Sequence, residues 1–258
     1  MTIPAVDVQD LERRVKDVYR EVALRPERTY HFEMGRSLAA RLGYPSDLLD
    51  QIPASALASF AGVGYYLDLA APFAGDRVLD LGSGSGTDSF ALAHLVGAEG
   101  HVTGVDMTDE QLAKAERLRA ETGRQNVEFV RGYIQNPPLP DASVDIVVSN
   151  GVINLAPDKS AVFRSAARVL APGGRLALAD IVSERPLTEA ITCNAELWAS
   201  CIGGATQVDE YLAAIHEAGL QVKEVRDNTA YEFLSESARG ATRTYGIKSI
   251  SLLAVAPS

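Results

Sequence analysis

The stretch Val78–Gly86, with the sequence VLDLGSGSG, decides the fold of this chain. Its apolar start, followed by glycine at every second position, predicts a buried strand that breaks into a glycine loop and opens a helix. A second strand, at 101–106, ends in Asp106, twenty residues after Gly86. Glycine lets the backbone turn tightly and approach a ligand, and a carboxylate at that distance accepts both hydroxyls of a ribose. Together the two features predict nucleotide binding in a βαβ unit.

The spacing of the glycines narrows the class of ligand. A dinucleotide-binding loop uses G-x-G-x-x-G, which brings a pyrophosphate to the helix N-terminus. Here the spacing is G-x-G-x-G after Asp80 and Leu81, and it resembles the first motif of the S-adenosylmethionine-dependent methyltransferases. The resemblance implies S-adenosyl-L-methionine as cofactor and S-adenosyl-L-homocysteine as product. The alternative is a glycine-rich turn in some other α/β protein.

The composition is that of an acidic, globular protein. Its 258 residues are 47% hydrophobic and 22% charged, enough for a full core in one domain with a small cap. The net charge of −10 and the lack of a Lys/Arg cluster disfavour DNA or RNA as a partner, although a tRNA or an RNA end stays open. We expect no signal peptide, no membrane span, a cytoplasmic location and no disulfide framework. The oligomeric state does not follow from the sequence.

Hydrophobic periodicity predicts an α/β fold, a Rossmann-like, doubly wound, mostly parallel seven-stranded sheet. Thr108 and Gln111 are expected to form a capping box. The last two strands are read as an antiparallel hairpin that closes the sheet, as in methyltransferases. We expect a helical N-terminal cap at 1–70 and a methyltransferase domain at 71–258. The expected helices are 7–25, 34–42, 86–96, 108–122, 158–171, 207–218 and 235–244, and the strands are 77–81, 101–106, 127–131, 144–149, 174–180, 221–227 and 247–255.

A ligand of such a sheet lies beyond the carboxyl ends of the strands. Asp106 is the expected acceptor for the ribose hydroxyls, and Met107 lies against the adenine face unless it is an ordinary core methionine. Gly82 and Gly84 let the backbone approach the methionine moiety, and Asn150 offers a side-chain or backbone carbonyl to its ammonium. The full expected cofactor site is Tyr19, Asp80, Gly82, Ser83, Gly84, Asp106, Met107, Gln111, Tyr133, Ile134 and Asn150, with no metal site.

The third strand departs from the commoner methyltransferase pattern. Many members place an acid after the glycine at the end of this strand, where it accepts from the adenine amine. Here Tyr133 and Ile134 follow Gly132. We therefore expect stacking, apolar contact and backbone groups to hold the adenine.

Further segments are similar to the arsenite methyltransferases. They are VKDVYREV at 15–22, GYI at 132–134, SNGVINL at 149–155, PDK at 157–159 and LWASCIGGA at 197–205. The resemblance runs from about residue 8 to about residue 220 and implies that Tyr19 packs over the cofactor. It also implies a small-molecule methyl acceptor, arsenic(III).

The cysteines of the chain differ from that family. Its members bind the soft As(III) centre through thiolates placed after the glycine loop, after the Ser-Asn of strand four and before Ile/Leu-Gly-Gly. Here Ser89 and Gly151 stand at the first two positions and only Cys201 remains. Cys201 and the additional Cys193 are the candidate catalytic residues and arsenic ligands, but either could be a buried structural thiol. On one continuous helix they would lie about 12 Å apart, so they share an arsenic only if the helix breaks near Asn194; otherwise small thiols such as glutathione must complete the site.

The other candidates for function stay open at this point. An oxygen or nitrogen acceptor requires a general base, and His31 is the one candidate that the sequence offers in the cap. Without an evident base, a thiolate or As(III) is favoured as the nucleophile. The alternatives are a methyltransferase of the same scaffold acting on a natural-product or quinone-like acceptor, and a cofactor-binding protein without catalysis.

Overall fold

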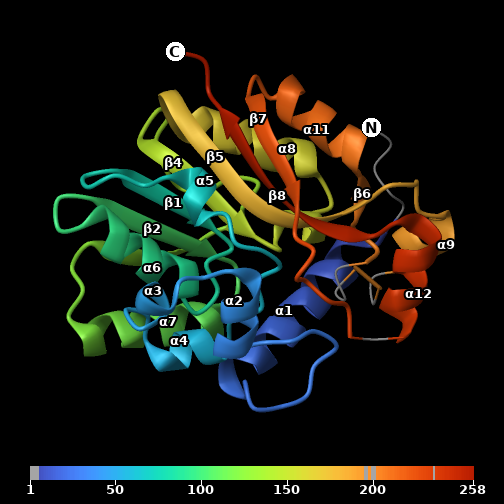
Figure 1. The fold of residues 1–258 in the computed structure, drawn as a ribbon, viewed down its shortest axis with the longest axis horizontal. Coiled ribbons are helices and arrows are strands. Elements are labelled where there is room, and N and C mark those ends of the chain that lie inside the picture. The colour runs from blue at the N-terminus through green and yellow to red at the C-terminus, as the bar shows by residue number, and fades with distance from the viewer. Residues whose placement is uncertain (1–5, 195–196, 199–201, 235) are drawn as a thin grey trace.

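The computed structural model describes residues 6–194, 197–198, 202–234 and 236–258. A central sheet in the strand order β3-β2-β1-β4-β5-β8-β7 runs through it, and β6 pairs with β5 beside this path (Figure 1). The strands pair in parallel except for β8, which runs antiparallel to both β5 and β7. The order reverses at β1, so the carboxyl ends of β1, β2 and β4 meet at the switch point where α/β sheets bind ligands.

Each expected helix and strand is present, and the bounds agree to within a few residues. The strands are β1 Arg77–Leu81, β2 His101–Asp106, β3 Val127–Arg131, β4 Val144–Asn150, β5 Leu170–Ser183, β6 Thr206–Gln207, β7 Gln221–Asp227 and β8 Lys248–Val255. The helices are α1 Val8–Leu24, α2 Arg36–Leu42, α3 Ser46–Leu49, α4 Ala54–Ala58, α5 Leu67–Ala70, α6 Thr87–Val96, α7 Asp109–Thr122, the 3-10 turn η1 Ile153–Leu155, α8 Lys159–Val169, α9 Glu189–Thr192, α11 Val208–Glu217 and α12 Glu236–Tyr245.

Two hydrophobic clusters pack on opposite faces of the sheet. Alternate residues of β1 divide between them, because Val78 belongs to one cluster and Leu79 to the other. The first cluster joins the sheet to α6 and to the cap helices, whereas the second joins it to α8 and α11. Figure 1 shows these two groups of helices on either side of the sheet. The cap therefore shares one continuous core with the sheet.

The C-terminus of α1 is tied to the body of the protein by a buried cation. Lys114 of α7 donates from Nζ to the Ala23 carbonyl (3.1 Å) and to Ser59 Oγ (2.7 Å). Ser59 in turn donates to the Val22 carbonyl. These contacts satisfy carbonyls that a helix end leaves without partners, and a cation there suits the helix dipole. They fix the helix that crosses the ligand site.

The structure contains five short helices that were not expected, α3, α4, α5, η1 and α9. It differs from the sequence-based expectations at three further places. The capping box is wrong, because the Thr108 side chain caps no amide of α7 and Gln111 turns elsewhere. The helix expected at 158–171 is shorter, because α8 ends at Val169 and Leu170 already begins β5. The two-residue strand β6 was not expected, and it adds an eighth strand to the seven of the sheet.

We expect Lys114→Met to lower the free energy of unfolding by about 1–3 kcal/mol, because two buried acceptors lose their donor. Urea denaturation measures the change. The control is Lys223→Met on exposed β7, which we expect to cost less than about 0.5 kcal/mol. Equal effects of the two substitutions would show that the buried contact is not what holds α1.

Candidate active site

One cavity lies at the carboxyl ends of β1, β2, β3 and β4, between the sheet and α1. All eleven residues of the expected cofactor site line it, although they come from segments as distant as Tyr19 and Asn150. The structure thus brings the set together, while the role of each residue in cofactor binding stays a prediction. His31, the candidate base, is not part of the lining.

The glycine loop forms the floor of this cavity. Gly82 has a φ of +77°, and a Cβ there would lie 2.5 Å from Cγ2 of Val152 on the facing wall. A Cβ at Gly84 would meet only Gln111 Oε1, at 3.7 Å, so the backbone is open to the cavity at that point. Beside it, Ser83 Oγ is buried without a hydrogen-bond partner in the described part of the chain. A polar ligand on exposed loop backbone fits these observations.

Asp106 is positioned as the expected acceptor of a diol. Its Oδ1 accepts from the Thr108 amide at 2.8 Å, and its Oδ2 accepts from the Gly84 amide at 3.0 Å. Each carboxylate oxygen has a second lone-pair site for a ligand hydroxyl. Burial raises the pKa of Asp106, and the two amides oppose this shift.

Two further carboxyl groups are buried under the loop. Asp88 accepts from the hydroxyls of Tyr44 (2.6 Å) and Tyr66 (3.0 Å), which belong to the cap. Asp80 accepts from Ser89 Oγ at 2.6 Å. Burial, with the neighbouring charge of Asp88 as the second cause, raises the pKa of Asp80 to about 8. Because Asp88 has the better set of donors, we assign the negative charge to Asp88 and the proton to Asp80 at neutral pH.

The side chain of Asn150 forms hydrogen bonds with the cap and with Asp88. Its Oδ1 accepts from the Val63 amide at 2.8 Å, and its Nδ2 donates to Gly64, Tyr44 and Asp88. The side chain therefore fastens the cap to the end of β4. The expected contact of an Asn150 carbonyl, from the side chain or the backbone, with a ligand ammonium stays a prediction.

Gln111 connects α1 to the glycine loop. Its Nε2 donates to the Tyr19 carbonyl at 2.8 Å, and its Oε1 accepts from Ser85 Oγ. Gln111 is 2% exposed and lines the cavity. Through Gln111, the position of Tyr19 over the cavity depends on the loop beneath it.

The end of β3 is covered by α1. Tyr133 donates its hydroxyl to Glu12 Oε1 at 2.8 Å, and Lys16 Nζ lies 5.3 Å from the centre of the Tyr133 ring. Ile134 is buried beside it, and Met107 is partly buried. The sequence did not predict Glu12 as a site residue. Its local pattern is that of any charged residue on a helix surface, and its partner Tyr133 lies 121 residues further along the chain.

One wall of the cavity is apolar. It includes Phe60, Ala61, Val152, Leu155 and Pro157. Ser89, one of the positions where the arsenite enzymes carry cysteine, is fully buried and does not belong to the lining. Gly151 has a φ of +71°, and a Cβ there would lie 3.1 Å from Val63.

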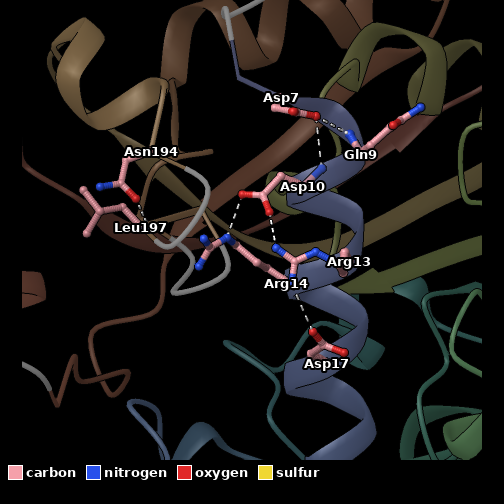
Figure 2. Close-up of polar contacts among 8 residues, drawn as sticks. All are labelled: Asp7, Gln9, Asp10, Arg13, Arg14, Asp17, Asn194 and Leu197. Carbon is pink, nitrogen blue, oxygen red and sulfur yellow. Dashed lines mark hydrogen bonds and ion pairs between the residues drawn. The ribbon is translucent and has the colours of Figure 1, made fainter.

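The two candidate arsenic ligands are placed as follows. Cys201 lies outside the described residues. Cys193 is a free, partly buried thiol that caps α9, and it is not among the residues that line the cavity. The helix breaks after Thr192, and Asn194 Oδ1 then accepts from the Leu197 amide at 3.1 Å (Figure 2). The described residues thus meet the condition of a helix break near Asn194, while a shared arsenic site of the two cysteines stays a prediction.

A buried ion cluster lies behind the apolar wall. Lys159 Nζ donates to the Ala156 carbonyl at 3.1 Å and lies 4.9 Å from the centre of the Trp198 ring. Asp180 accepts from the Tyr211 hydroxyl at 2.7 Å and supplies the opposite charge. Burial lowers the pKa of Lys159 to about 8, and Asp180 opposes this shift. The cluster joins the wall to Trp198, whose ring packs against Gly203.

Comparison with known proteins agrees with this geometry. Residues 72–219 match the methyltransferase domain family. The chain belongs to the S-adenosylmethionine-dependent methyltransferases. Its fold is the Rossmann-like α/β fold of that class, and its cofactor is S-adenosylmethionine. The resemblance to the arsenite methyltransferases is also confirmed.

Three relatives show the breadth of this methyltransferase family. An arsenite methyltransferase of Halobacterium salinarum is 40% identical over 205 residues, 79% of this chain and 52% of the relative. The structure of CrArsM, an arsenic(III) S-adenosylmethionine methyltransferase from Chlamydomonas reinhardtii, has a TM-score of 0.64 at 30% identity and covers 88% of this chain and 75% of its own. A 27-O-demethylrifamycin SV methyltransferase of Amycolatopsis mediterranei is 35% identical over 162 residues, 61% of this chain and 58% of the relative. The chain spans about half the length of the curated relatives it matches.

We expect Gly82→Ala to weaken S-adenosylhomocysteine binding by about tenfold or more, because the new Cβ collides with Val152 and strains the loop. Gly123→Ala is the matched control, since its φ is +66° and a Cβ there meets nothing within 4 Å. Both variants carry backbone strain, but only the first alters the cavity. Isothermal titration calorimetry measures the affinity, and equal losses in both variants would show that the glycine loop at Gly82 does not contact the ligand.

Cofactor affinity should rise with pH through Asp80. A carboxyl with a raised pKa holds its proton below about pH 8, and a bound cation favours its ionised form. We therefore expect the affinity to increase about tenfold between about pH 6.5 and 8.5. The ligand's own amino group titrates in this range, so Asp80→Asn is the reference. A wild-type pH profile parallel to that of the variant would rule out Asp80 as the titrating group.

Proposed function

We propose that this methyltransferase methylates arsenite, arsenic(III). The observation that carries the proposal is the chemistry of the wall beyond the cofactor residues. The described residues of this wall carry no side chain that takes up a proton: they are Phe60, Ala61, Val152, Leu155 and Pro157. The carboxyl groups of the lining accept hydrogen bonds from the glycine loop, its helix, the cap and the end of β3: they are Asp106, Asp80, Asp88 and Glu12. An oxygen or nitrogen acceptor must give up the proton on its attacking atom to a base, whereas the arsenic of As(III) attacks through a lone pair and carries no proton. The likeness to arsenite methyltransferases supports the same acceptor.

Each group of residues around the cavity would have its own role in the reaction. When bound, S-adenosylmethionine supplies an electrophilic methyl group on a positively charged sulfur. Gly82, Gly84 and Asp106 would hold the methionine moiety and the ribose, and the ionised Asp88 would favour a cationic ligand. The apolar wall at Val152 and Leu155 would exclude water beside the acceptor. Orientation of two reactants in this way supplies a large part of the rate of a displacement.

Thiols complete the proposed arsenic site. We propose Cys201 as a protein ligand of arsenic, and Cys193 as a second ligand only if the segment around Asn194 brings it to the cavity. Since the described lining contains no thiol, glutathione or another small thiol would supply the remaining sulfur ligands, which suits a reducing cytoplasm. Residues 1–70 would serve as the cap and residues 71–258 as the catalytic domain.

A small organic acceptor is the second candidate. The lack of a thiol in the described lining favours it, together with the glycine at position 151 and the likeness to a methyltransferase of a rifamycin. Such an acceptor would have to arrive as a pre-ionised or lone-pair-rich nucleophile, because the described wall provides no base.

The deciding assay combines the protein with S-adenosylmethionine, arsenite and excess glutathione, and detects methylated arsenicals by mass spectrometry. We expect product above the control without enzyme, and a loss of about tenfold or more in Cys201→Ser, because a soft centre loses a soft ligand. Cys193→Ser is the comparison and should retain most of the activity.

Full arsenic methylation by Cys201→Ser would contradict the proposed ligand. Turnover restricted to organic acceptors would favour the second candidate. The absence of S-adenosylhomocysteine formation with every acceptor would leave a cofactor-binding protein without catalysis.

A further inference from the structure

Glu12 of α1 is a carboxylate at the cavity that the cofactor assignment leaves unused. It lines the cavity from the side of α1 and is partly exposed. Its Oε1 accepts from Lys16 Nζ and from the Tyr133 hydroxyl. Within the described part of the chain, both of these hydrogen bonds use the same oxygen. Oε2 therefore keeps its lone pairs for another donor.

If Asp106 holds the ribose, Glu12 would lie at the base end of a bound nucleoside. Asp106 marks the ribose at the end of β2, and Met107 and Ile134 provide apolar surfaces next to it. The base must extend from the ribose toward the end of β3. Tyr133 lies two residues beyond β3 and fixes Glu12 at that end.

The chemistry of the carboxylate matches one edge of adenine. The exocyclic 6-amino group is a hydrogen-bond donor, and an ionised carboxylate is only an acceptor. The hydrogen bonds from Lys16 and Tyr133 lower the pKa of Glu12, which keeps it ionised at neutral pH. The third strand offers no acid, because Tyr133 occupies that place; its hydroxyl holds an acid from another segment instead.

We propose that Glu12 recognises the purine base, its carboxylate accepting a hydrogen bond from the exocyclic amine. The N-terminal helix then contributes to base selection, and a 6-aminopurine nucleoside is preferred over one that has no donor at this position. This inference rests on the cofactor assignment of the proposed function and is independent of the identity of the acceptor.

The test compares two ligands by isothermal titration calorimetry on the full chain. One is S-adenosylhomocysteine, and the other is its analogue with hydrogen in place of the 6-amino group. We expect Glu12→Ala to weaken binding of the first about five- to tenfold, as for a partly exposed charged hydrogen bond. Binding of the second should change less than about twofold, because the partner of the carboxylate is already absent.

Glu110→Ala is the matched control. It removes the ion pair between Glu110 and Arg20 (3.0 Å), which also joins α1 to α7, but Glu110 does not line the cavity. We expect equal, small effects on both ligands. Thermal unfolding of each variant verifies that α1 has not simply detached.

Equal losses for both ligands in Glu12→Ala would show that Glu12 only holds α1, and no loss would show that it does not act at all; either result overturns the proposal. If the wild-type protein bound neither ligand, the cofactor assignment would fall together with this proposal. Missing arsenic turnover with intact ligand discrimination would overturn only the proposed acceptor.

Discussion

The hydrogen bond from the Gly84 amide to the Asp106 carboxylate fixes the loop after β1 against the end of β2. This hydrogen bond requires a backbone that turns with positive φ at Gly82 and Gly84. It also requires that β2 end beside the end of β1. The parallel pairing of β1 with β2 places the two strand ends side by side, because Leu81 lies opposite Val105. The carboxylate is thus held by the same backbone that would receive the ligand.

Electrostatic balance explains why the cap is fastened so firmly at this point. Two buried carboxyl groups, Asp80 and Asp88, lie under a loop with no lysine or arginine in the described lining of the cavity. Tyrosine hydroxyls from the cap and the Asn150 amide stabilise Asp88 in place of a cation. A cationic cofactor would supply the missing positive charge. The cap therefore covers the site and also supplies the hydrogen bonds that stabilise the buried charge of Asp88.

The sequence predicted the sheet because each strand carries its own signal, a short apolar run bounded by glycine or charge. It predicted Asp106 and the glycines because their spacing is local. It could not predict that Asn150 binds Val63, that Gln111 reaches Tyr19, or that Tyr133 holds Glu12. These contacts join residues 87, 92 and 121 positions apart. Such pairs depend on how the cap lies on the sheet, and no periodicity encodes that. The capping box failed for the same reason, since a distant carbonyl competed successfully for the Gln111 side chain.

The ammonium of Lys159 lies at the first turn of α8, the end of a helix that disfavours a cation. Asp180 and the face of Trp198 offset this cost, so the indole ring is held beside a fixed charge. Trp198 is the only tryptophan of the chain and neighbours the segment that carries Cys201. The protein thus contains a single tryptophan fluorophore beside the wall to which we assign the acceptor, and its emission reports on that wall without any label.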